Sequence, residues 1–480
     1  MTQKDYAVDI CIIGAGAGGL SIASGAAQLG RSVVLFEAGD MGGDCLNSGC
    51  VPSKALIAAG KHAHALTSGA PYGVSPAKPQ VNFSAVKAHV KGIIEHIAPV
   101  DSQERFEGLG CTVIREKARF EDTKTVVSDS ARVTAKRIII ATGSRAAAPP
   151  IAGLDKTPYL TNEDVFDLDN LPKHLLIIGA GPIGLELGQA FLRLGSTVEI
   201  FDLFAPLGRS EPEHASALVE ALKAEGVIFH APVKTKSVSK TKTGVAITLE
   251  DGQVIKGSHL LVAAGRSPAT GGLDAQKGGV ALSKRGHVET DANLRTSNKR
   301  VYAVGDVSGR GGLTHAAGFH AGQIIKAFYF MPPIINKFTA KANTHRMPAA
   351  IYTQPELASI GLTEAAAREA HGDNVRVVSA HFDDNDRAIA ERSELGGVKI
   401  VATKKGVILG ASILGEGAGE LITLLSLAMT NKVKISGLAQ FIAPYPTRAE
   451  AVKRAAGSWY TEALFSDKSK KWAGLMTRFH

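Results

Sequence analysis

Two closely spaced cysteines are the residues of this sequence best suited to catalysis. Cys45 and Cys50 lie in the segment GGDCLNSGCVPSK, with four residues between them. A secreted disulfide scaffold would carry many more cysteines than the four in this chain of 480 residues. A close pair beside a strand–helix unit is more typical of redox chemistry, and the helix expected from Val51 would stabilise a thiolate near its N-terminus. The pair is therefore predicted to be redox-active.

The other two cysteines have a different setting. Cys11 lies in the apolar run DICII and Cys111 in the predicted strand CTVIRE. Thiols in such runs usually act as small buried hydrophobes, so we assign them no chemistry.

A glycine-rich loop near the N-terminus predicts a dinucleotide site. It follows the apolar strand 8–13, opens a helix that runs to Leu29, and precedes a strand that ends at Glu37. Its glycines are Gly14, Gly16 and Gly19. Glycines there permit a tight turn and close approach of backbone N–H groups to a pyrophosphate, while the acid about 20 residues on can bind ribose hydroxyls.

The same arrangement recurs at residues 175–202, which predicts a second dinucleotide site. The glycines of this loop are Gly179, Gly181 and Gly184. Asp202 ends the next strand, and a carboxylate there binds a free ribose diol and repels a 2′-phosphate. NAD(H) is therefore preferred to NADP(H), although the nearby Arg209 leaves NADP(H) open.

The repeated units predict an α/β chain with two Rossmann-like dinucleotide-binding domains and a separate C-terminal α+β domain. Strands that end in glycine recur at 137–143, 259–266 and 300–306, and no new phosphate loop appears after about residue 345. The expected division has four parts, at residues 1–150, 151–280, 281–344 and 345–480.

Composition narrows the class of protein further. Hydrophobic residues make up 45% of the chain, as in an ordinary globular enzyme, and no apolar run is long enough to span a bilayer. The net charge of +9 is dispersed, so no nucleic-acid surface is predicted. The N-terminus lacks the pattern of a signal peptide, and we expect a cytoplasmic protein.

An ordered series of motifs resembles the pyridine nucleotide-disulfide oxidoreductases, among them lipoamide dehydrogenase, glutathione reductase and mercuric reductase. Beyond the two glycine loops and the cysteine segment, the series covers nearly the whole chain. It continues with ATGS (141–144), AAGRSP (263–268), YAVGD (302–306), YTQPELASIGLTE (352–364) and PYPTRAE (444–450).

The resemblance implies that residues 1–150 and 281–344 form the two parts of an FAD-binding domain, that 151–280 bind NAD(P)H, and that 345–480 form the dimerisation domain of a homodimer. It also implies a role for each matching residue, and no metal site is predicted. Cys50 would face the flavin, Cys45 would meet the substrate, and Lys54 would lie near the flavin in a pair with Glu186. A buried lysine keeps its proton best beside a carboxylate, and its charge would stabilise the reduced flavin. Further residues implied to hold FAD are Gly43, Ala118, Thr142, Gly143, Asp306, Thr314 and His315, and Gly265 is implied to hold NAD.

Two residues depart from the family pattern. The disulfide reductases carry a histidine in a His-Pro-Thr motif, where this chain has Tyr445, although Glu450 is retained. A phenol with a pKa of about 10 is a poor acid–base group at neutral pH. Asp44 stands where the family usually has threonine, and its charge should raise the pKa of Cys45 or favour a cationic substrate.

The expected activity is that of a flavin-dependent NAD(P)H:disulfide/dithiol oxidoreductase that resembles dihydrolipoamide dehydrogenase. Two alternatives stay open: a mercuric-reductase-like enzyme that reduces a metal ion or another small acceptor, and a non-catalytic flavoprotein subunit of a larger complex. The C-terminal stretch from Ser458 mixes aromatic, aliphatic and lysine residues. It is expected to pack on the dimer, with an anionic membrane surface as the alternative.

Overall fold

The computed structural model describes residues 3–332, 341–342 and 346–479. The chain forms two compact units: the first holds the described residues up to Leu203 and those from Ile228 to Ala342, and the second holds Phe204–Val227 and the described residues from Arg346 on. The predicted boundary between residues 344 and 345 lies outside the described residues. The four-part division therefore stays a prediction, and it did not anticipate that 204–227 groups with the C-terminal unit.

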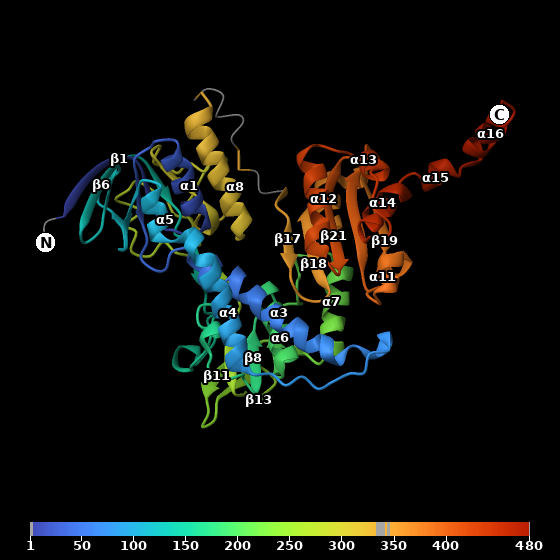
Figure 1. The fold of residues 1–480 in the computed structure, drawn as a ribbon, viewed down its shortest axis with the longest axis horizontal. Helices are drawn as coiled ribbons and strands as arrows, with labels where there is room; N and C mark the ends of the chain where they lie inside the picture. Colours follow the sequence, from blue (N-terminus) through green and yellow to red (C-terminus); the bar gives the residue numbers. More distant parts are fainter. Residues whose placement is uncertain (1–2, 333–340, 343–345, 480) are drawn as a thin grey trace. The chain divides into compact units, whose positions relative to one another are not determined.

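The first unit contains the sheet that the N-terminal motif predicts (Figure 1). Its strand order is β3–β2–β1–β6–β5–β4, with β16 also paired to β6. The strands are β1 (Lys4–Ile13), β2 (Val33–Phe36), β3 (Cys111–Ile114), β4 (Arg119–Phe120), β5 (Thr125–Val127), β6 (Ala131–Ile140) and β16 (Val301–Ala303). Pairing is parallel between β1 and its neighbours β2 and β6, as expected for strands whose C-terminal ends are apolar and buried.

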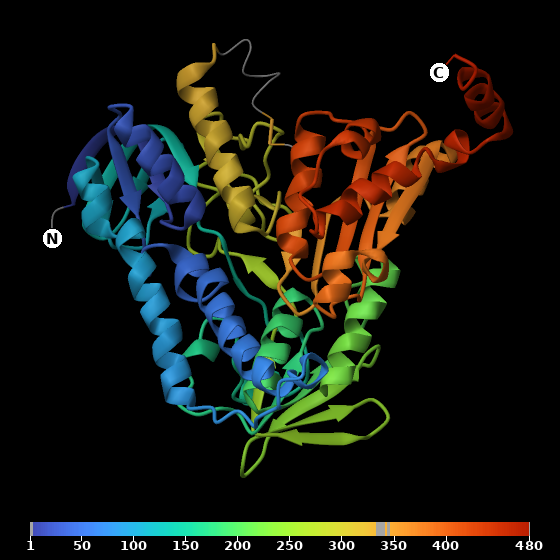
Figure 2. The same ribbon diagram turned by 45° about the vertical axis from the view of Figure 1, so that its right-hand side comes forward.

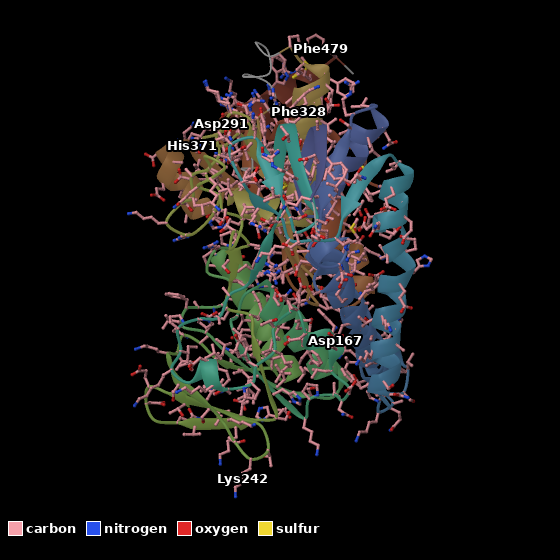
Figure 3. The ribbon with its side chains drawn as sticks, turned by 90° about the vertical axis from the view of Figure 1, so that its left-hand side faces the viewer. Asp167, Lys242, Asp291, Phe328, His371 and Phe479 are labelled. Carbon is pink, nitrogen blue, oxygen red and sulfur yellow. The ribbon has the colours of Figure 1, made fainter. Side chains whose placement is uncertain are left out.

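A second parallel sheet in the same unit repeats this plan, in the order β10–β9–β8–β14. Its strands are β8 (His174–Ile178), β9 (Thr197–Phe201), β10 (Ile228–His230) and β14 (His259–Val262). An antiparallel ribbon of β11 (Thr235–Lys240), β12 (Val245–Leu249) and β13 (Val254–Gly257) adjoins it, and Lys242 lies in the turn between β11 and β12 (Figure 3). The short strands β7 (Ser144–Ala146) and β15 (Arg266–Pro268) form an antiparallel pair.

Helices of the first unit bring the predicted site residues together. They are α1 (Ala17–Gln28), α2 (Gly43–Asn47), α3 (Cys50–Thr67), α4 (Phe83–Ile97), α5 (Gln103–Gly108), α6 (Pro182–Leu194) and α8 (Thr314–Ile325). α3 packs closely on α6 at Gly60. A Cβ atom there would lie only 3.1 Å from the carbonyl oxygen of Ala190, so the glycine permits the close approach. This close approach sets the active-site end of α3 against the helix that follows the second glycine loop.

The second unit is an antiparallel sheet covered by helices, in the order β17–β18–β21–β20–β19 (Figure 2). Its strands are β17 (Ala349–Ile351), β18 (Glu356–Gly361), β19 (Val375–His381), β20 (Gly397–Thr403) and β21 (Ile408–Gly415). Its helices are α7 (Pro212–Glu225), α10 (Glu364–His371), α11 (Asp386–Ala390), α12 (Ala418–Thr430), α13 (Ile435–Gln440), α14 (Ala449–Ser458), α15 (Thr461–Leu464) and α16 (Asp467–Met476).

The two faces of this second sheet bury different partners. Val398 and Ile400 on β20 join the core formed with α12 and α14, whereas Val401 packs with Ala367 of α10. Lys399 points to the α10 side as well, where its ammonium lies 2.8 Å from Glu211 Oε2. The alternation follows from the two-residue period of a strand.

These arrangements confirm the expected fold class: two dinucleotide-binding α/β folds and a C-terminal α+β fold. Cys11 and Cys111 are buried, as predicted, and burial raises the pKa of the Cys11 thiol. Within the described part of the chain, no helix is both long and apolar enough to cross a membrane.

Candidate active site

The first glycine loop has the geometry of a phosphate cradle. Gly14 has a φ of +107°, and a Cβ atom there would lie 2.5 Å from the carbonyl oxygen of Ala141. At Gly19 a Cβ atom would lie 1.9 Å from the carbonyl oxygen of Gly14, so only glycine lets α1 start so close to the strand. Glu37 Oε2 accepts a hydrogen bond of 2.6 Å from the N–H of Ala15, which holds the predicted ribose-binding carboxylate against the loop.

The glycines before the cysteines explain how the redox segment approaches this loop. Gly42 forms a parallel bridge with Gly16, and its N–H donates to the carbonyl oxygen of Ala15 at 3.0 Å. Gly43 has a φ of +62°, and a Cβ atom there would lie 2.8 Å from the Cα atom of Gly16. Two consecutive glycines therefore allow α2 to begin in direct contact with the phosphate loop.

Several features of the same unit fit FAD. The buried hydroxyl of Thr142 has no hydrogen-bond partner among the described residues, as expected of a group that awaits a ligand. Gly143 has a φ of +68°, and a Cβ atom there would meet nothing within 4 Å. Ser144 Oγ donates to Asp306 Oδ2 at 2.6 Å, which orients the predicted phosphate–ribitol ligand. Ala118, another residue implied to hold FAD, has its side chain buried in the core of this unit.

The structure brings the two predicted redox cysteines into direct contact. Cys45 lies in α2, and Cys50 is the first residue of α3. Neither cysteine forms a disulfide in this structure, and the two thiols are close enough that each shifts the pKa of the other. Thr314 Oγ1, at the start of α8, lies 3.4 Å from Cys50 Sγ.

The two thiols differ in acidity. The hydrogen bond from Cys45 lowers the pKa of Cys50 to about 6 against the effect of burial, and Thr314 and the charge of Lys54 act in the same direction. The hydrogen bond to Cys50 raises the pKa of Cys45, and burial and the Asp44 charge add to this. At neutral pH the reduced pair therefore carries its negative charge on Cys50.

A lysine and a glutamate from two helices form the predicted ion pair. Lys54 Nζ, one turn after Cys50 on α3, lies 2.8 Å from Glu186 Oε2 on α6. The glutamate is nearly buried and the lysine is partly exposed. The pair forms because α3 and α6 pack at Gly60, a contact between segments more than 100 residues apart.

The Asp44 carboxylate is held by three polar groups. Its oxygens lie 3.2 Å from Arg266 Nη2, 2.9 Å from Asn162 Nδ2 and 3.0 Å from Ser48 Oγ. Arg266 Nε in turn donates to Ser144 Oγ at 2.7 Å. Asp44 thus anchors the cysteine segment to the strand that carries AAGRSP, an arrangement that sequence reasoning missed.

The second glycine loop has the same close backbone contact and the same carboxylate hydrogen bond as the first. A Cβ atom at Gly184 would lie 2.0 Å from the carbonyl oxygen of Gly179, whereas one at Gly181 would meet nothing within 4 Å. Asp202 Oδ2 accepts from the N–H of Ala180 at 2.7 Å, as Glu37 does from Ala15. Gly265, with a φ of +148°, follows β14. The loop fits a pyridine dinucleotide.

The start of α8 carries two of the residues implied to hold FAD. Thr314, implied to hold FAD, places its hydroxyl on Cys50, and His315 beside it is exposed. His320 is buried, and its Nδ1 atom accepts from the N–H of Gly305 at 3.2 Å. Burial lowers the pKa of His320 to about 4, so the ring is neutral and structural.

In the second unit, the two residues implied to act in acid–base catalysis do not form a pair with each other. Tyr445 is 72% exposed, and its hydroxyl donates to Asp386 Oδ2 at 2.8 Å. Glu450 Oε2 accepts from the N–H of Thr447 at 3.2 Å, at the start of α14. The Asp386 carboxylate raises the pKa of Tyr445, which makes the phenol less able to exchange a proton at neutral pH. Nothing in the sequence pointed to Asp386.

Comparison with known families agrees with this geometry. The family model of the pyridine nucleotide-disulphide oxidoreductases matches residues 8–321, and the model of its dimerisation domain matches residues 347–456. The chain belongs to this family. It is therefore an enzyme, a flavin-dependent disulfide oxidoreductase, and the hypothesis of a non-catalytic subunit is not retained. The family uses FAD and a pyridine nucleotide, and the dimerisation domain supports a homodimer.

Similar proteins include both branches that the motifs suggest. A mercuric reductase of Streptomyces lividans is 35% identical over 96% of this chain and 98% of its own length. A dihydrolipoyl dehydrogenase of Thermus scotoductus is 33% identical over 96% of this chain and 99% of its own length. Among solved structures, the flavoprotein disulfide reductase RclA of Escherichia coli has a TM-score of 0.83 at 25% identity, over 94% of this chain and 99% of that one.

Proposed function

We propose that this enzyme moves two electrons between a reduced nicotinamide, NADH by preference, and a disulfide or dithiol substrate by way of FAD and the Cys45–Cys50 pair. The observation that carries the proposal is the thiol pair itself. Cys45 and Cys50 are in hydrogen-bonding contact at the start of α3, with Thr314 on one thiol and the Lys54–Glu186 pair one turn away.

The two cysteines and Lys54 have different roles in this electron transfer. FAD, when bound, supplies the two-electron relay between nicotinamide and sulfur. Cys50 holds the thiolate that donates electrons or receives them, and the Lys54 charge stabilises that thiolate. Cys45 keeps a proton when the pair is reduced and becomes the attacking thiolate when that proton is removed.

A disulfide substrate would be reduced in two thiol–disulfide exchange steps. The Cys45 thiolate attacks one sulfur of the substrate, and the second sulfur leaves as a thiolate that takes up a proton. The Cys50 thiolate then attacks the Cys45 sulfur, which releases the remaining substrate thiol and restores the Cys45–Cys50 disulfide. These steps transfer two electrons to the substrate. Two electrons from the nicotinamide must then reduce the Cys45–Cys50 disulfide before the next turnover.

The preference for NADH rests on Asp202. Its carboxylate is held against the second glycine loop by the N–H of Ala180, in the place where a 2′-phosphate would suffer repulsion.

A second candidate acceptor is a thiol-binding metal ion, which would be reduced as a substrate. Tyr445 favours this candidate, because the phenol is exposed and bound to Asp386 and so offers no acid near neutral pH. General acid–base help contributes about 10²–10⁴-fold, and a metal ion held by two thiolates needs no protonated leaving group. Several relatives are named mercuric reductases. Asp44 does not add to this argument, because its carboxylate is already held by Arg266 and Asn162.

An anaerobic titration with NADH tests the electron path. Reduction should produce a long-wavelength absorption band from a thiolate beside the flavin, and Cys50→Ser should remove it while Cys111→Ser leaves it intact. A band that persists in Cys50→Ser would show that the path is wrong.

An acceptor panel then separates the two candidates. The purified enzyme is supplied with NADH and with lipoamide, glutathione disulfide, Hg(II) or Cu(II). Disulfide turnover that rises about 10²-fold in Tyr445→His, with metal reduction unchanged, would identify the wild type as a metal-ion reductase. Rapid lipoamide turnover by the wild type would exclude that candidate and support the disulfide substrate.

A further inference from the structure

The C-terminal end of the second unit is a helical arm that lies beyond the dimerisation-domain match. That match ends at residue 456, whereas the chain continues through α15 (Thr461–Leu464) and α16 (Asp467–Met476). Figures 1 and 2 both show these two helices extending from the end of α14 away from the sheet of their own unit.

The arm exposes large apolar side chains along one side. Trp472, Leu475 and Phe479 are 62%, 42% and 74% exposed and together form the apolar stripe of the arm. Trp472 and Leu475 lie one turn apart on α16, and Phe479 follows four residues later, just after the helix ends. Phe479 is labelled in Figure 3. Leu464 and Phe465, at the end of α15, are 62% and 68% exposed. Such a concentration of exposed aromatic surface marks a contact site.

The base of the arm is well anchored. Arg376 of β19 lies 4.5 Å above the ring of Trp459, and one of its nitrogens lies 3.8 Å from Glu462 Oε2 on α15. Ser466 caps α16 by accepting from the N–H of Ser469 at 3.3 Å, and Ser469 Oγ donates back to the carbonyl oxygen of Ala463 at 2.7 Å. The direction in which the arm leaves the unit is therefore set by specific contacts.

A helix of ten residues is marginal in water when nothing covers its apolar face. The covering partner must therefore be present whenever the protein is folded. The chain belongs to a family with a dimerisation domain, and α15 begins three residues after the helix α14 of that domain. Leu427 and Ile442 of the same unit add exposed apolar surface, at 64% and 90%.

We propose that α15 and α16 of each protomer pack against a second copy of this chain and bury the Trp472–Leu475–Phe479 stripe there. The arm thereby extends the interface of the dimerisation domain beyond residue 456. This inference does not depend on the proposed substrate or on the redox chemistry.

The basic residues of the arm define the competing partner. Lys468, Lys470, Lys471 and Arg478 could attract an anionic membrane. The apolar stripe is narrow and α16 is short, which suits a groove on a protein better than the broad apolar face of a membrane-bound helix.

Sedimentation equilibrium of the holoenzyme tests the proposal. The stripe variant Trp472→Ser/Leu475→Ser/Phe479→Ser should raise the dimer dissociation constant by about tenfold or more. The matched control Lys470→Ser/Ala473→Ser/Thr477→Ser carries the same number of serines on the opposite side of α16 and should leave the constant unchanged. Equal constants for the wild type and both variants would overturn the proposal.

Fluorescence gives a second readout, which reports directly on the burial of Trp472. The chain has two tryptophans, so Trp459→Phe leaves Trp472 as the only one. Its emission should be shielded from acrylamide in the dimer and become accessible on dilution to the monomer. A Trp472 that is equally accessible in dimer and monomer would refute burial at the interface. So would shielding that appears only when phosphatidylserine vesicles are added, since this would assign the arm to a membrane.

Discussion

The hydroxyl of Thr314 offers the sharpest test of how the fold tunes the redox thiols. It lies 3.4 Å from Cys50 Sγ and is among the groups that lower the pKa of that thiol. The substitution Thr314→Val keeps the shape of the side chain and removes the hydroxyl. Thr314→Ser keeps the hydroxyl and serves as the matched control.

The size of the effect follows from the geometry. A hydrogen bond to a charged group contributes about 1.5–3 kcal/mol, and a sulfur acceptor places this bond near the lower limit. One pKa unit corresponds to about 1.36 kcal/mol. Thr314→Val should therefore raise the pKa of Cys50 from about 6 to about 7. At about pH 6.5 the thiolate fraction would fall about threefold, from roughly 75% to roughly 25%.

Two assays report this titration. The reduced holoenzyme is followed by its long-wavelength thiolate–flavin band as a function of pH, and the rate of Cys50 alkylation by iodoacetamide is measured over the same range. Thr314→Ser should titrate like the wild type in both. If Thr314→Val and Thr314→Ser titrate at the same pH, the hydroxyl does not stabilise the thiolate and the reasoning fails.

Three further predictions concern the supporting structure. Gly43→Ala should lower FAD retention, measured as the ratio of flavin to protein absorbance, because its Cβ atom would press on Gly16 of the phosphate loop. Gly73→Ala is the matched control: it carries a similar strain from a positive φ, but its Cβ position is open, so FAD retention should not change. Lys399→Met should cost about 3–5 kcal/mol in chemical denaturation followed by circular dichroism, since it removes the ammonium that pairs with the buried carboxylate of Glu211. The Lys399 ammonium lowers the pKa of Glu364, so the stability that this carboxylate adds is present above its unfolded pKa and is lost as the pH falls. The deficit of Lys399→Met should accordingly stay nearly constant above about pH 5 and shrink as the pH falls below about 4.5, and a deficit independent of pH over that lower range would contradict this account. Asp44→Asn should lower the stability of the first unit by about 1 kcal/mol and lower the pKa of Cys50, measured by thermal melting and by alkylation, and an unchanged thiol titration would argue against its charge acting on the pair.

The local sequence was sufficient to predict most of the first unit. The run at residues 8–13 lies within β1, and the helix after it ends at Gln28, one residue before the predicted Leu29. The cysteine helix begins at Cys50, one residue before the predicted Val51. These predictions succeed because apolar periodicity and glycine spacing are short-range signals.

The contacts that tune the site could not be predicted in this way. Thr314 reaches Cys50 across 264 positions of the chain, and Arg266 reaches Asp44 across more than 200. Tyr445 was recognised as a departure from the family, but its partner Asp386 lies 59 positions away in a segment with no motif. No pattern of neighbouring residues encodes such pairings.

The sequence by itself determined which chemistry is present: two dinucleotide loops, one thiol pair, and a lysine and a glutamate suited to each other. Backbone geometry demands glycine where a loop must turn tightly, and that demand is visible in the residues themselves. Only the tertiary structure decided which thiol carries the charge, because the pKa of Cys50 depends on the hydrogen bond from Cys45, on Thr314 and on Lys54. A pKa responds to charges and donors in space, and the packing of α2, α3 and α8 sets those distances.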